Sequence, residues 1–596
     1  MTKLTGFLPP ALARPFSALG GVLLAIAAML PWATFLLNGG AYPDKATLQF
    51  FDAPLALTGF RWHVLLLGVA AVVLTFVPIV GRARVLRAIG WGGVAISALS
   101  AAFIVSEGGG LGAITAADGN TAFGSIVGVI GGVVLVLGAG ATGIEDVPHW
   151  PTAIFGLTGW AGRLAAWGAL ALAFAAVLWL VAQTLTAGGI GGAAFPYAGP
   201  IFLAFLGFAG AVLGALHGAG ITGWVARLSE EYRAFSIVVL LLCAFALPFT
   251  DAGNTYWMQV AANIGVYAAT AIGLNIVVGL AGLLDLGYVA FLGIGAFVAA
   301  NLSGAAASEL GWHLPFPLAA LIAAVVAGVF GAIVGSPTLR VRGDYLAIVT
   351  LAFGEIFYRS AQNNIGGLTG GANAIPGIPP IELFGLGFNQ SVTLFGAELP
   401  SGVLYYFLIV LVVAVVMAVF ANLKNSRIGR AWIAIREDED AARAMGIRTG
   451  QAKILAFVVG AALAGIAGAV FVHKLGTAAD ASFRFLESVT LLAAVVLGGM
   501  GTIPGAVLGA SLLFVLPEKL REFDEYRLLV FGLALVFIMR FRPQGLVPDR
   551  VRRAEFAGET EEGKRIEEVQ ERAVLEQELE LEREHEAPPG PKEGGR

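Results

Sequence analysis

Residues 422–453 read NLKNSRIGRAWIAIREDEDAARAMGIRTGQAK, and this dense run of charges stands between two long apolar segments. Charges at this density belong in water, so the flanking apolar segments are predicted to cross a membrane while the charged loop lies outside it. The surplus of Arg and Lys in the loop predicts the cytoplasmic side, because cytoplasmic loops carry an excess of these residues.

Apolar residues recur along this charged loop at helical spacing and leave the charges on the opposite face; they are Ile428, Trp432, Ile435, Ala442 and Met445. The pattern fits a solvated loop. It also fits a short amphipathic coupling helix, which carries force from a cytoplasmic motor into the membrane spans. A helix docked in a groove would use Ile428, Trp432 and Ile435 as anchors, at positions i, i+4 and i+7. Gly446 would then let the chain turn back toward the membrane.

The composition excludes a soluble globular protein. The chain has 596 residues, of which 58% are hydrophobic and only 13% are charged, so we predict an all-α polytopic membrane protein. Its 81 glycines favour closely packed helices, because small residues let helices approach in lipid. A single cysteine, Cys243, and scattered histidines predict no disulfide framework and no metal site. We expect no cofactor and no nucleic-acid partner. We expect the lipid bilayer to be a partner.

About sixteen segments are apolar enough to be membrane spans, for which roughly 20 residues are needed. They are residues 17–37, 62–80, 86–105, 122–142, 164–184, 199–216, 235–249, 258–280, 287–304, 317–334, 345–358, 403–421, 454–473, 487–500, 504–516 and 528–539. Lys3 and Arg14 place the N-terminus in the cytoplasm, and an even count returns the C-terminus there. The loop 107–120 carries acids but no Lys or Arg, which is consistent with the outside. A cleaved signal peptide at the start is disfavoured, because no small-x-small site follows the first apolar run.

Two of these segments, 487–500 and 504–516, are short for full spans. A glycine- and proline-rich turn joins them, containing Gly498, Gly499, Gly501, Pro504 and Gly505. Half-length helices are tolerated at membrane depth where they line a cavity, so we predict a helix break at this turn.

Two acids belong to one apolar segment: Asp344 at its border and Glu355 eleven residues later, on the same helical face. Acids inside a membrane are costly and usually face a cavity or a partner, which favours a polar lining of a solute path. Equally, Asp344 could cap the helix start while Glu355 bonds to a neighbouring helix. No catalytic dyad, triad or metal cluster accompanies them, so an enzyme is not expected.

The stretch 558–565 nearly matches a phosphate-binding P-loop, but Arg565 stands where a Ser or Thr would hold magnesium, and no strand precedes it. If ATP drives this protein, the sequence predicts that a separate chain hydrolyses it.

Several stretches together resemble the branched-chain amino acid ABC transporter permeases of the LivM type. These are GLLDLGYVAF at 282–291, RGDYLAIVTLAFGEI at 342–356, LTGGAN at 368–373, the loop 426–446, the turn 498–505 and RPQGL at 542–546. Their order and spacing match as well, and the resemblance covers roughly residues 256–548.

The resemblance implies a core of about ten spans with an internal repeat. It implies as partners a homologous second permease of the LivH type, two ATP-binding subunits and an extracytoplasmic solute-binding protein. It adds Asp285 and Thr350 to Asp344 and Glu355 as candidates for the translocation path. Asp440, Ala441, Ala442 and Gly446 correspond to the Glu-Ala-Ala…Gly coupling motif of such permeases. The match departs where Asp replaces Glu and no Pro follows.

We therefore expect the permease subunit of an ATP-driven importer of branched-chain or related hydrophobic amino acids, in the plasma membrane of a prokaryote. Its expected parts are an added module (1–150), a membrane extension (151–233), the permease core (234–548) and a charged tail (549–596). The alternatives are a permease for urea or small amides and a membrane scaffold or sensor. A secondary transporter would need an ion site at unwound helices, and no suitable polar cluster is seen.

Overall fold

The computed structural model describes the chain from residue 9 to residue 547 with gaps. The described ranges are 9–34, 36–37, 40–41, 60–107, 109–117, 119–141, 150–151, 159–186, 198–339, 344–383, 385–394, 396–519 and 545–547, with single positions between 529 and 540. The predicted charged tail and its P-loop-like stretch lie outside the described residues.

The described chain is helical and divides into two compact units, with the divisions falling inside three long helices: α9 (Thr255–Asn275), α13 (Val403–Lys424) and α18 (Ile503–Lys519). The first unit comprises residues 1–265, 380–414 and 514–531, and the second comprises 266–379, 415–513 and 532–596. The described strands form only short two-stranded antiparallel pairs.

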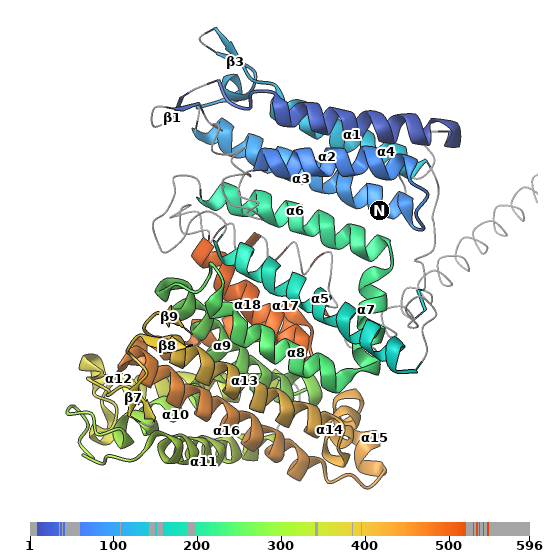
Figure 1. The fold of residues 1–596 in the computed structure, drawn as a ribbon. Coiled ribbons are helices and arrows are strands. Elements are labelled where there is room, and N and C mark those ends of the chain that lie inside the picture. Colours follow the sequence, from blue (N-terminus) through green and yellow to red (C-terminus); the bar gives the residue numbers. More distant parts are fainter. Residues whose placement is uncertain are drawn as a thin grey trace, which may run out of the picture. The chain divides into compact units, whose positions relative to one another are not determined.

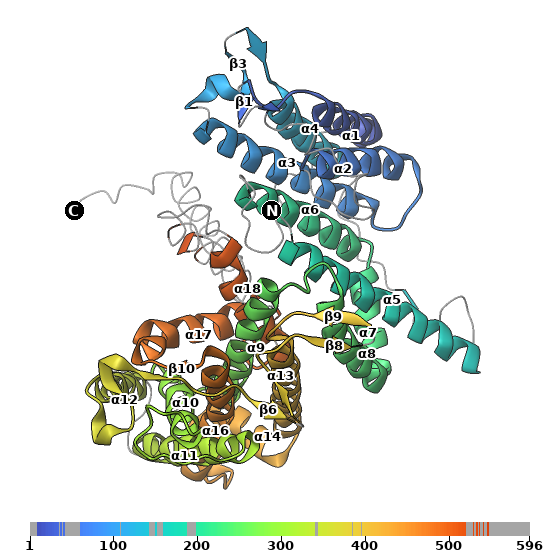
Figure 2. The same ribbon diagram turned by 60° about the vertical axis from the view of Figure 1, so that its left-hand side comes forward.

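The first unit holds the N-terminal helices, which lie side by side in Figures 1 and 2. Its helices are η2 (Pro10–Leu12), α1 (Ala13–Met29), α2 (Phe60–Phe76), α3 (Arg82–Glu107), η4 (Leu111–Ile114), α4 (Gly124–Gly140), α5 (Gly159–Thr186), α6 (Ala198–Gly218), α7 (Ile221–Glu231), α8 (Arg233–Ala246) and η6 (Leu247–Phe249). Its strand pairs are β1 (Leu36–Leu37) with β2 (Gly40–Ala41), β3 (Ala116–Ala117) with β4 (Asn120–Thr121), β6 (Glu382–Leu383) with β7 (Leu386–Gly387), and β8 (Val392–Leu394) with β9 (Ala397–Leu399).

Glycines let the helices of the first unit pack backbone against backbone. A Cβ at Gly20 of α1 would clash with the backbone of Leu135 in α4, and one at Gly132 of α4 would clash with Gly90 in α3. This is the close approach that small residues allow between helices in lipid. α6 contributes Ala204 and Ala211 to the same buried cluster. The N-terminal helices and α6 therefore share one core.

The second unit is organised around α16 (Thr449–Leu475), which packs against α10 (Val289–Leu302) and α11 (Phe316–Gly335) in both ribbon views (Figures 1 and 2). Glycines again allow two helices, here α16 and α10, to approach closely, since a Cβ at Gly468 would clash with the carbonyl of Leu292. The remaining elements are the π-helix η7 (Ile276–Leu280), η8 (Ser336–Leu339), α12 (Asp344–Gln362), η9 (Ile365–Gly367), η10 (Gly371–Asn373), β5 (Ile375–Pro376) paired with β10 (Thr477–Ala478), α14 (Arg427–Glu437), α15 (Glu439–Ala444), η11 (Asp480–Phe483) and α17 (Phe485–Gly498).

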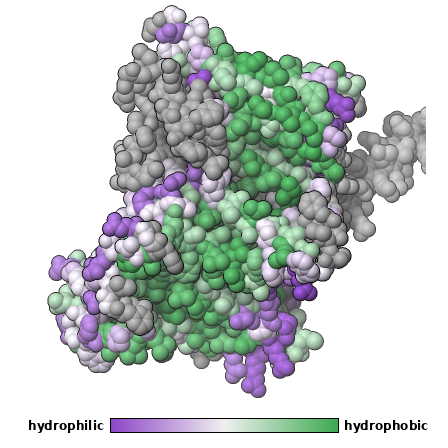
Figure 3. Space-filling model, viewed as in Figure 1, coloured by the Kyte–Doolittle hydropathy of each residue, from purple (hydrophilic) through white to green (hydrophobic). Residues whose placement is uncertain are grey.

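The distribution of hydrophobic and hydrophilic residues on the surface is the one expected of a membrane protein. Hydrophobic residues cover the flanks of the long helices, while hydrophilic residues gather at helix ends, including the region of α14 and α15 (Figure 3). Large apolar side chains such as Leu172, Leu321 and Val325 are more than half exposed. Exposed apolar side chains at this density are suited to lipid.

Seven described helices are long and apolar enough to cross a membrane, or eight if the bent pair Ala204–Gly218 and Ile221–Glu231 counts as one span. Six shorter apolar helices accompany them: Ala13–Met29, Arg61–Phe76, Gly124–Gly140, Arg233–Phe249, Val289–Leu302 and Ile503–Glu518. An all-α protein with multiple spans is thereby confirmed, but the expected count of about sixteen is not. The expected segment 345–358 is helical without passing this test, and most of 528–539 lies outside the described residues.

Candidate functional site

The candidate site is built on two places in the second unit where a helix stops and the chain continues without helical structure. The first helix break, residues 281–288, follows α9 and the π-helix η7 and precedes α10. Gly282 has a φ of +70°, a conformation that glycine adopts without penalty. A π-helical turn is rare and often marks a functional position.

Asp285 lies in this first break and is 1% exposed. Its Oδ1 accepts a hydrogen bond from the Gly287 N–H at 2.9 Å, whereas its Oδ2 has no hydrogen-bond partner among the described residues. A buried carboxylate oxygen without a partner is costly, and in a membrane protein such groups commonly mark a solute or ion pathway. Asp285 therefore has an acceptor available for a passing group.

Thr350 of α12 is brought next to this break, as its place among the candidates requires. Its buried hydroxyl accepts from the Leu286 N–H at 3.0 Å and donates to the Ala347 carbonyl at 3.0 Å. Gly287 lies directly against α12, where a Cβ would clash with the Thr350 carbonyl. Hydrogen bonding and close packing thus hold the first break against α12 near Asp285 and Thr350.

The two other acids of the candidate set, Asp344 and Glu355, both belong to α12. Asp344 begins α12, and its side chain is outside the described residues. The Glu355 side chain is 45% exposed and pairs with Arg359 of its own helix at 2.8 Å. Glu355 is thus not buried, and among the described residues its ion pair is with Arg359 of the same helix. An exposed ion pair of this kind contributes about 0.2–1 kcal/mol to stability.

The second helix break, residues 499–502, lies between α17 and α18. Gly499 and Gly501 have φ values of +124° and +78°, and a Cβ at Gly498 would clash with the carbonyl of Gly505. Pro504 is the second residue of α18, where its missing N–H costs nothing. Each glycine of this turn therefore either adopts a positive φ or allows a close backbone approach.

Backbone groups of residues 546 and 547 form hydrogen bonds with the residues around this second break. The N–H groups of Leu546 and Val547 donate to the carbonyls of Leu497 and Gly498, each at 2.8 Å. The Thr502 hydroxyl bonds to the Val547 carbonyl at 2.9 Å. These contacts satisfy carbonyls that the end of α17 would otherwise leave unpaired.

Asn275, at the end of α9 and ahead of the first break, bonds to the second break. Its Oδ1 accepts from the Gly501 N–H at 2.8 Å, and its Nδ2 donates to the Thr502 carbonyl at 2.9 Å. The side chain is fully buried. Sequence reasoning missed Asn275, and the only signal was a polar amide at the end of an apolar segment.

The charged loop, residues 422–453, departs from the single helix that was predicted. It forms two helices, α14 and α15, which are separated at Asp438 with φ −156° and ψ 109°. The Asp438 carboxylate accepts from the N–H groups of Asp440 and Ala441, each at 2.9 Å. An Asp at this position caps a new helix, and this cap ends the continuous helix that periodicity predicts.

The apolar face of α14 is covered by this chain itself, which corrects the expected anchors. Trp432 and Ile435 are buried, and the Trp432 Nε1 donates to the Ala452 carbonyl at 2.7 Å. Ala442 of α15 is buried as well. Ile428 and Met445 remain available, at 38% and 84% exposure. The exposed apolar side chains therefore lie at the two ends of the loop.

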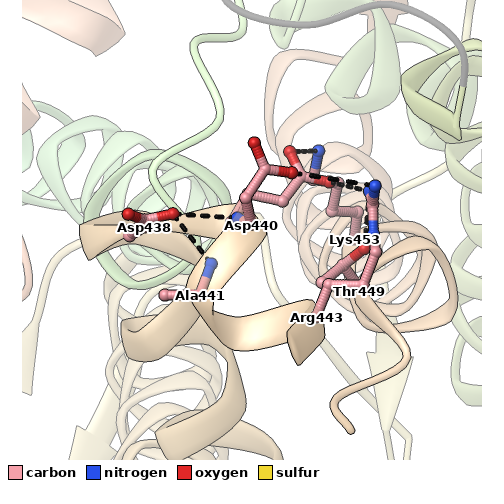
Figure 4. A network of polar contacts seen from close by, with 7 residues as sticks. Asp438, Asp440, Ala441, Arg443, Thr449 and Lys453 are labelled. Atoms are coloured by element: carbon pink, nitrogen blue, oxygen red, sulfur yellow. Dashed lines mark hydrogen bonds and ion pairs between the residues drawn. The ribbon is translucent and has the colours of Figure 1, made fainter. Parts of the chain in front are cut away.

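A polar network fixes α15 on the start of α16 (Figure 4). The Lys453 Nζ, which is buried, lies 2.6 Å from the Glu439 Oε2, and Arg443 pairs with the other oxygen of Glu439 at 3.1 Å. Arg443 also reaches the Thr449 hydroxyl at 3.4 Å. Gly446 follows with φ +85°, a left-handed conformation that ends the segment after α15. The tip of the loop is thereby held rigidly.

Comparison with known proteins gives consistent matches to one family. The family profile described as branched-chain amino acid transport system / permease component matches residues 256–539. The chain is 42% identical over 324 residues to the high-affinity branched-chain amino acid transport system permease protein LivM of Escherichia coli K12, covering 52% of this chain and 74% of that protein. It is 30% identical over 308 residues to BraD of Pseudomonas aeruginosa, a permease protein of the same kind of system, covering 47% and 91%.

A shorter match reaches a second permease type. The chain is 32% identical over 133 residues to the LivH permease protein of Escherichia coli K12, which is 22% of this chain and 43% of LivH. No solved structure gives a significant match. The region matched by the family profile contains both helix breaks and the charged loop.

Proposed function

This chain belongs to the branched-chain amino acid transport system permease family, and from that premise we propose that it forms part of the translocation path of an ATP-driven importer. The cargo we propose is branched-chain or related hydrophobic amino acids. The observation that carries the proposal is the 42% identity to LivM over 74% of that protein. A multi-pass protein of this family is a transport subunit, and the chemistry of ATP hydrolysis is assigned to separate subunits.

The partners are a second permease of the LivH type, two ATP-binding subunits and an extracytoplasmic solute-binding protein. The match to LivH supports the first of these, because two homologous permeases can pair about a pseudo-two-fold axis. The family membership is the ground for proposing an internal repeat within a core of about ten spans. The charge bias supports cytoplasmic termini and about sixteen crossings.

The translocation path is proposed to pass the first helix break. Asp285 carries this assignment, because its unpartnered Oδ2 can accept a hydrogen bond from an amino-acid ammonium group. Thr350 holds the break against α12, and Asp344 and Glu355 of the same helix are proposed as further residues of the path. Because Glu355 is exposed and paired only with its neighbour Arg359, Glu355→Gln should lower uptake without changing the fold.

The coupling contact is proposed to lie at α15 and the turn after it. Met445 is the large apolar side chain most exposed on the loop, with Asp440, Ala441 and Gly446 on the same segment. Methionine is enriched in protein interfaces, and a rigid tip transmits force better than a flexible one. Ile428 is proposed to flank this contact, while Trp432, Ile435 and Ala442 support it from within the chain.

Four parts are proposed along the chain: an added module (1–150), a membrane extension (151–233), the permease core (234–548) and a charged tail (549–596). The family profile begins at residue 256, which supports a boundary ahead of it. The added module shares a buried cluster with α6, so it is proposed to be anchored on the extension.

Reconstitution tests the proposed function. The chain is co-expressed with its second permease and ATP-binding subunits, placed in lipid vesicles, and supplied with the solute-binding protein and labelled leucine. We expect leucine accumulation that requires ATP and that isoleucine and valine inhibit. Accumulation driven by an ion gradient without ATP would identify a secondary transporter, and uptake of urea in place of leucine would favour the small-amide alternative.

A further inference from the structure

Two basic side chains of the charged loop bond to backbone beside the helix breaks: Arg436 to the π-helix η7 that leads into the first break, and Lys424 to the second break itself. Arg436, at the end of α14, donates from its Nη1 to the Gly279 carbonyl of the π-helix at 2.9 Å. Lys424, at the end of α13, donates from its Nζ to the Gly501 carbonyl of the second break at 2.8 Å. The loop is thus bonded both to the π-helix and to the second break.

The two glycine carbonyls that receive these cations belong to backbones in direct contact. A Cβ at Gly279 would clash with the Gly501 nitrogen and with the Asn275 Oδ1. Both backbone groups of Gly501 are occupied, its N–H by Asn275 and its carbonyl by Lys424. The π-helix that leads into the first break is therefore fastened to the second break, and both are bonded to the loop.

The electrostatics favour these contacts. Gly279 lies in the last turn of η7, where carbonyls lack helical partners and carry the negative end of the helix dipole, so the Arg436 cation stabilises its carbonyl. The Gly501 carbonyl lies between α17 and α18, and Lys424 supplies it with a charged donor. The Arg436 side chain is only 11% exposed, and its position is fixed by Glu437, whose Oε1 lies 3.0 Å from the Arg436 Nε. If this contact breaks, the guanidinium charge stays in a partly buried site without its hydrogen-bond acceptor, which costs free energy.

We propose that Arg436 and Lys424 are positioning residues for transport, which force both helix breaks to follow the charged loop when an ATP-binding subunit moves it. Asn275 makes the two breaks move as one body. The proposal rests on the proposed coupling function of the loop. If the loop moved alone, the carbonyls of Gly279 and Gly501 would be left unpaired, and this penalty keeps loop and breaks together.

The proposal differs from a merely structural role in one measurable quantity, the number of solute molecules imported per ATP hydrolysed. A structural tether, when removed, lowers assembly, hydrolysis and uptake together. A coupling tether, when removed, lets the ATP-binding subunits bind and hydrolyse while uptake per ATP falls.

The experiment uses the complete complex in lipid vesicles and compares Arg436→Met with Arg430→Met. Arg430 lies on the same helix, is exposed, and donates to Asn425 within the loop. We expect Arg436→Met to retain co-purification of the ATP-binding subunits and ATP hydrolysis while leucine uptake per ATP falls about tenfold, the factor expected for a hydrogen bond from a charged donor. Arg430→Met should match the wild type. An unchanged ratio in Arg436→Met would overturn the proposal.

A second variant covers the case in which Arg436→Met does not assemble. Asn275→Asp keeps an acceptor for the Gly501 N–H but removes the donor to the Thr502 carbonyl. A fall in uptake per ATP with assembly intact supports the proposal, and a wild-type ratio overturns it. If the proposed function itself is wrong, the wild-type chain will fail to co-purify with ATP-binding subunits. This outcome differs from failure of the coupling proposal, in which the complex assembles normally.

Discussion

Trp432 donates its indole N–H to the carbonyl oxygen of Ala452 at 2.7 Å, and its ring is fully buried between α14 and the start of α16. This contact ties the first helix of the charged loop to the span that follows it. Trp432 is therefore a core residue of the loop, with no face left for a partner.

Replacing Trp432 by alanine should destabilise the chain. Truncating a buried Trp typically costs about 3–5 kcal/mol, because a cavity remains and the hydrogen bond is lost. Trp432→Phe fills most of the space and leaves only the Ala452 carbonyl unpaired, at a cost of about 1–3 kcal/mol. Thermal unfolding of the purified protein should rank wild type above Phe above Ala. Unchanged stability in Trp432→Ala would show that the ring is not part of the core.

Met445 provides the complementary test of the docking surface. Its 84% exposed side chain contributes little to the fold, so Met445→Glu should leave the unfolding temperature unchanged. An unpaired charge in an apolar contact is costly, and binding of the ATP-binding subunits should weaken by about tenfold or more. Met445→Leu keeps the apolar contact and is the control. Wild-type co-purification of Met445→Glu would place the docking surface elsewhere.

Gly446 tests the backbone at the same turn. Its φ is +85°, and a Cβ there would meet nothing within 4 Å, so backbone conformation alone limits the side chain. A β-branched residue held in this conformation costs about 1–3 kcal/mol, so Gly446→Val should be destabilised or should shift the loop. Asn tolerates positive φ, and Gly446→Asn should behave nearly as the wild type. Equal stability of the two variants would argue against the strained turn.

The sequence predicted a charged loop at 422–453, a glycine-rich turn at 498–505 and a chain turn at Gly446, because glycine spacing and charge clusters act locally. Periodicity showed that Ile428, Trp432 and Ile435 share an apolar face, but it cannot show what covers that face. In the structure the chain itself covers Trp432 and Ile435. The cap at Asp438 was also missed, because an Asp inside a charged run resembles any solvated residue.

The link made by Asn275 was beyond prediction for another reason. Its partners Gly501 and Thr502 are 226 and 227 residues away in the sequence, and only the folded chain brings them together. The same holds for the contact of Arg436 with Gly279, which spans 157 residues. Sequence reasoning found the elements of the site, whereas the contacts between them depend on packing.

The side of the membrane on which the loop lies can be tested by labelling. Cys243 is the single cysteine, so a Cys243→Ser chain provides the background. Ala444→Cys in α15 is exposed, and an impermeant maleimide should label it only after the membrane is permeabilised. Leu111→Cys, at a position that is 70% exposed in η4 of the expected outside loop, should be labelled on intact cells. Labelling of Ala444→Cys on intact cells would reverse the proposed topology.

Asp285 gives the most direct test of the path. Asp285→Asn keeps the Oδ1 that accepts from the Gly287 N–H, removes the charge, and replaces the Oδ2 acceptor with an amide NH2 of nearly the same size. The chain should therefore fold with a stability within about 1 kcal/mol of the wild type, while leucine uptake falls by about tenfold or more because the charge-assisted contact is lost.

Asp285→Ala is the matched comparison. It removes the charge and also leaves the buried Gly287 N–H unpaired, which costs about 1–3 kcal/mol. Uptake should then be lost together with stability, measured as leucine accumulation in vesicles and as the unfolding temperature of the same preparations. If Asp285→Asn transports leucine at the wild-type rate, the carboxylate serves only to cap the break, and the solute must pass other side chains.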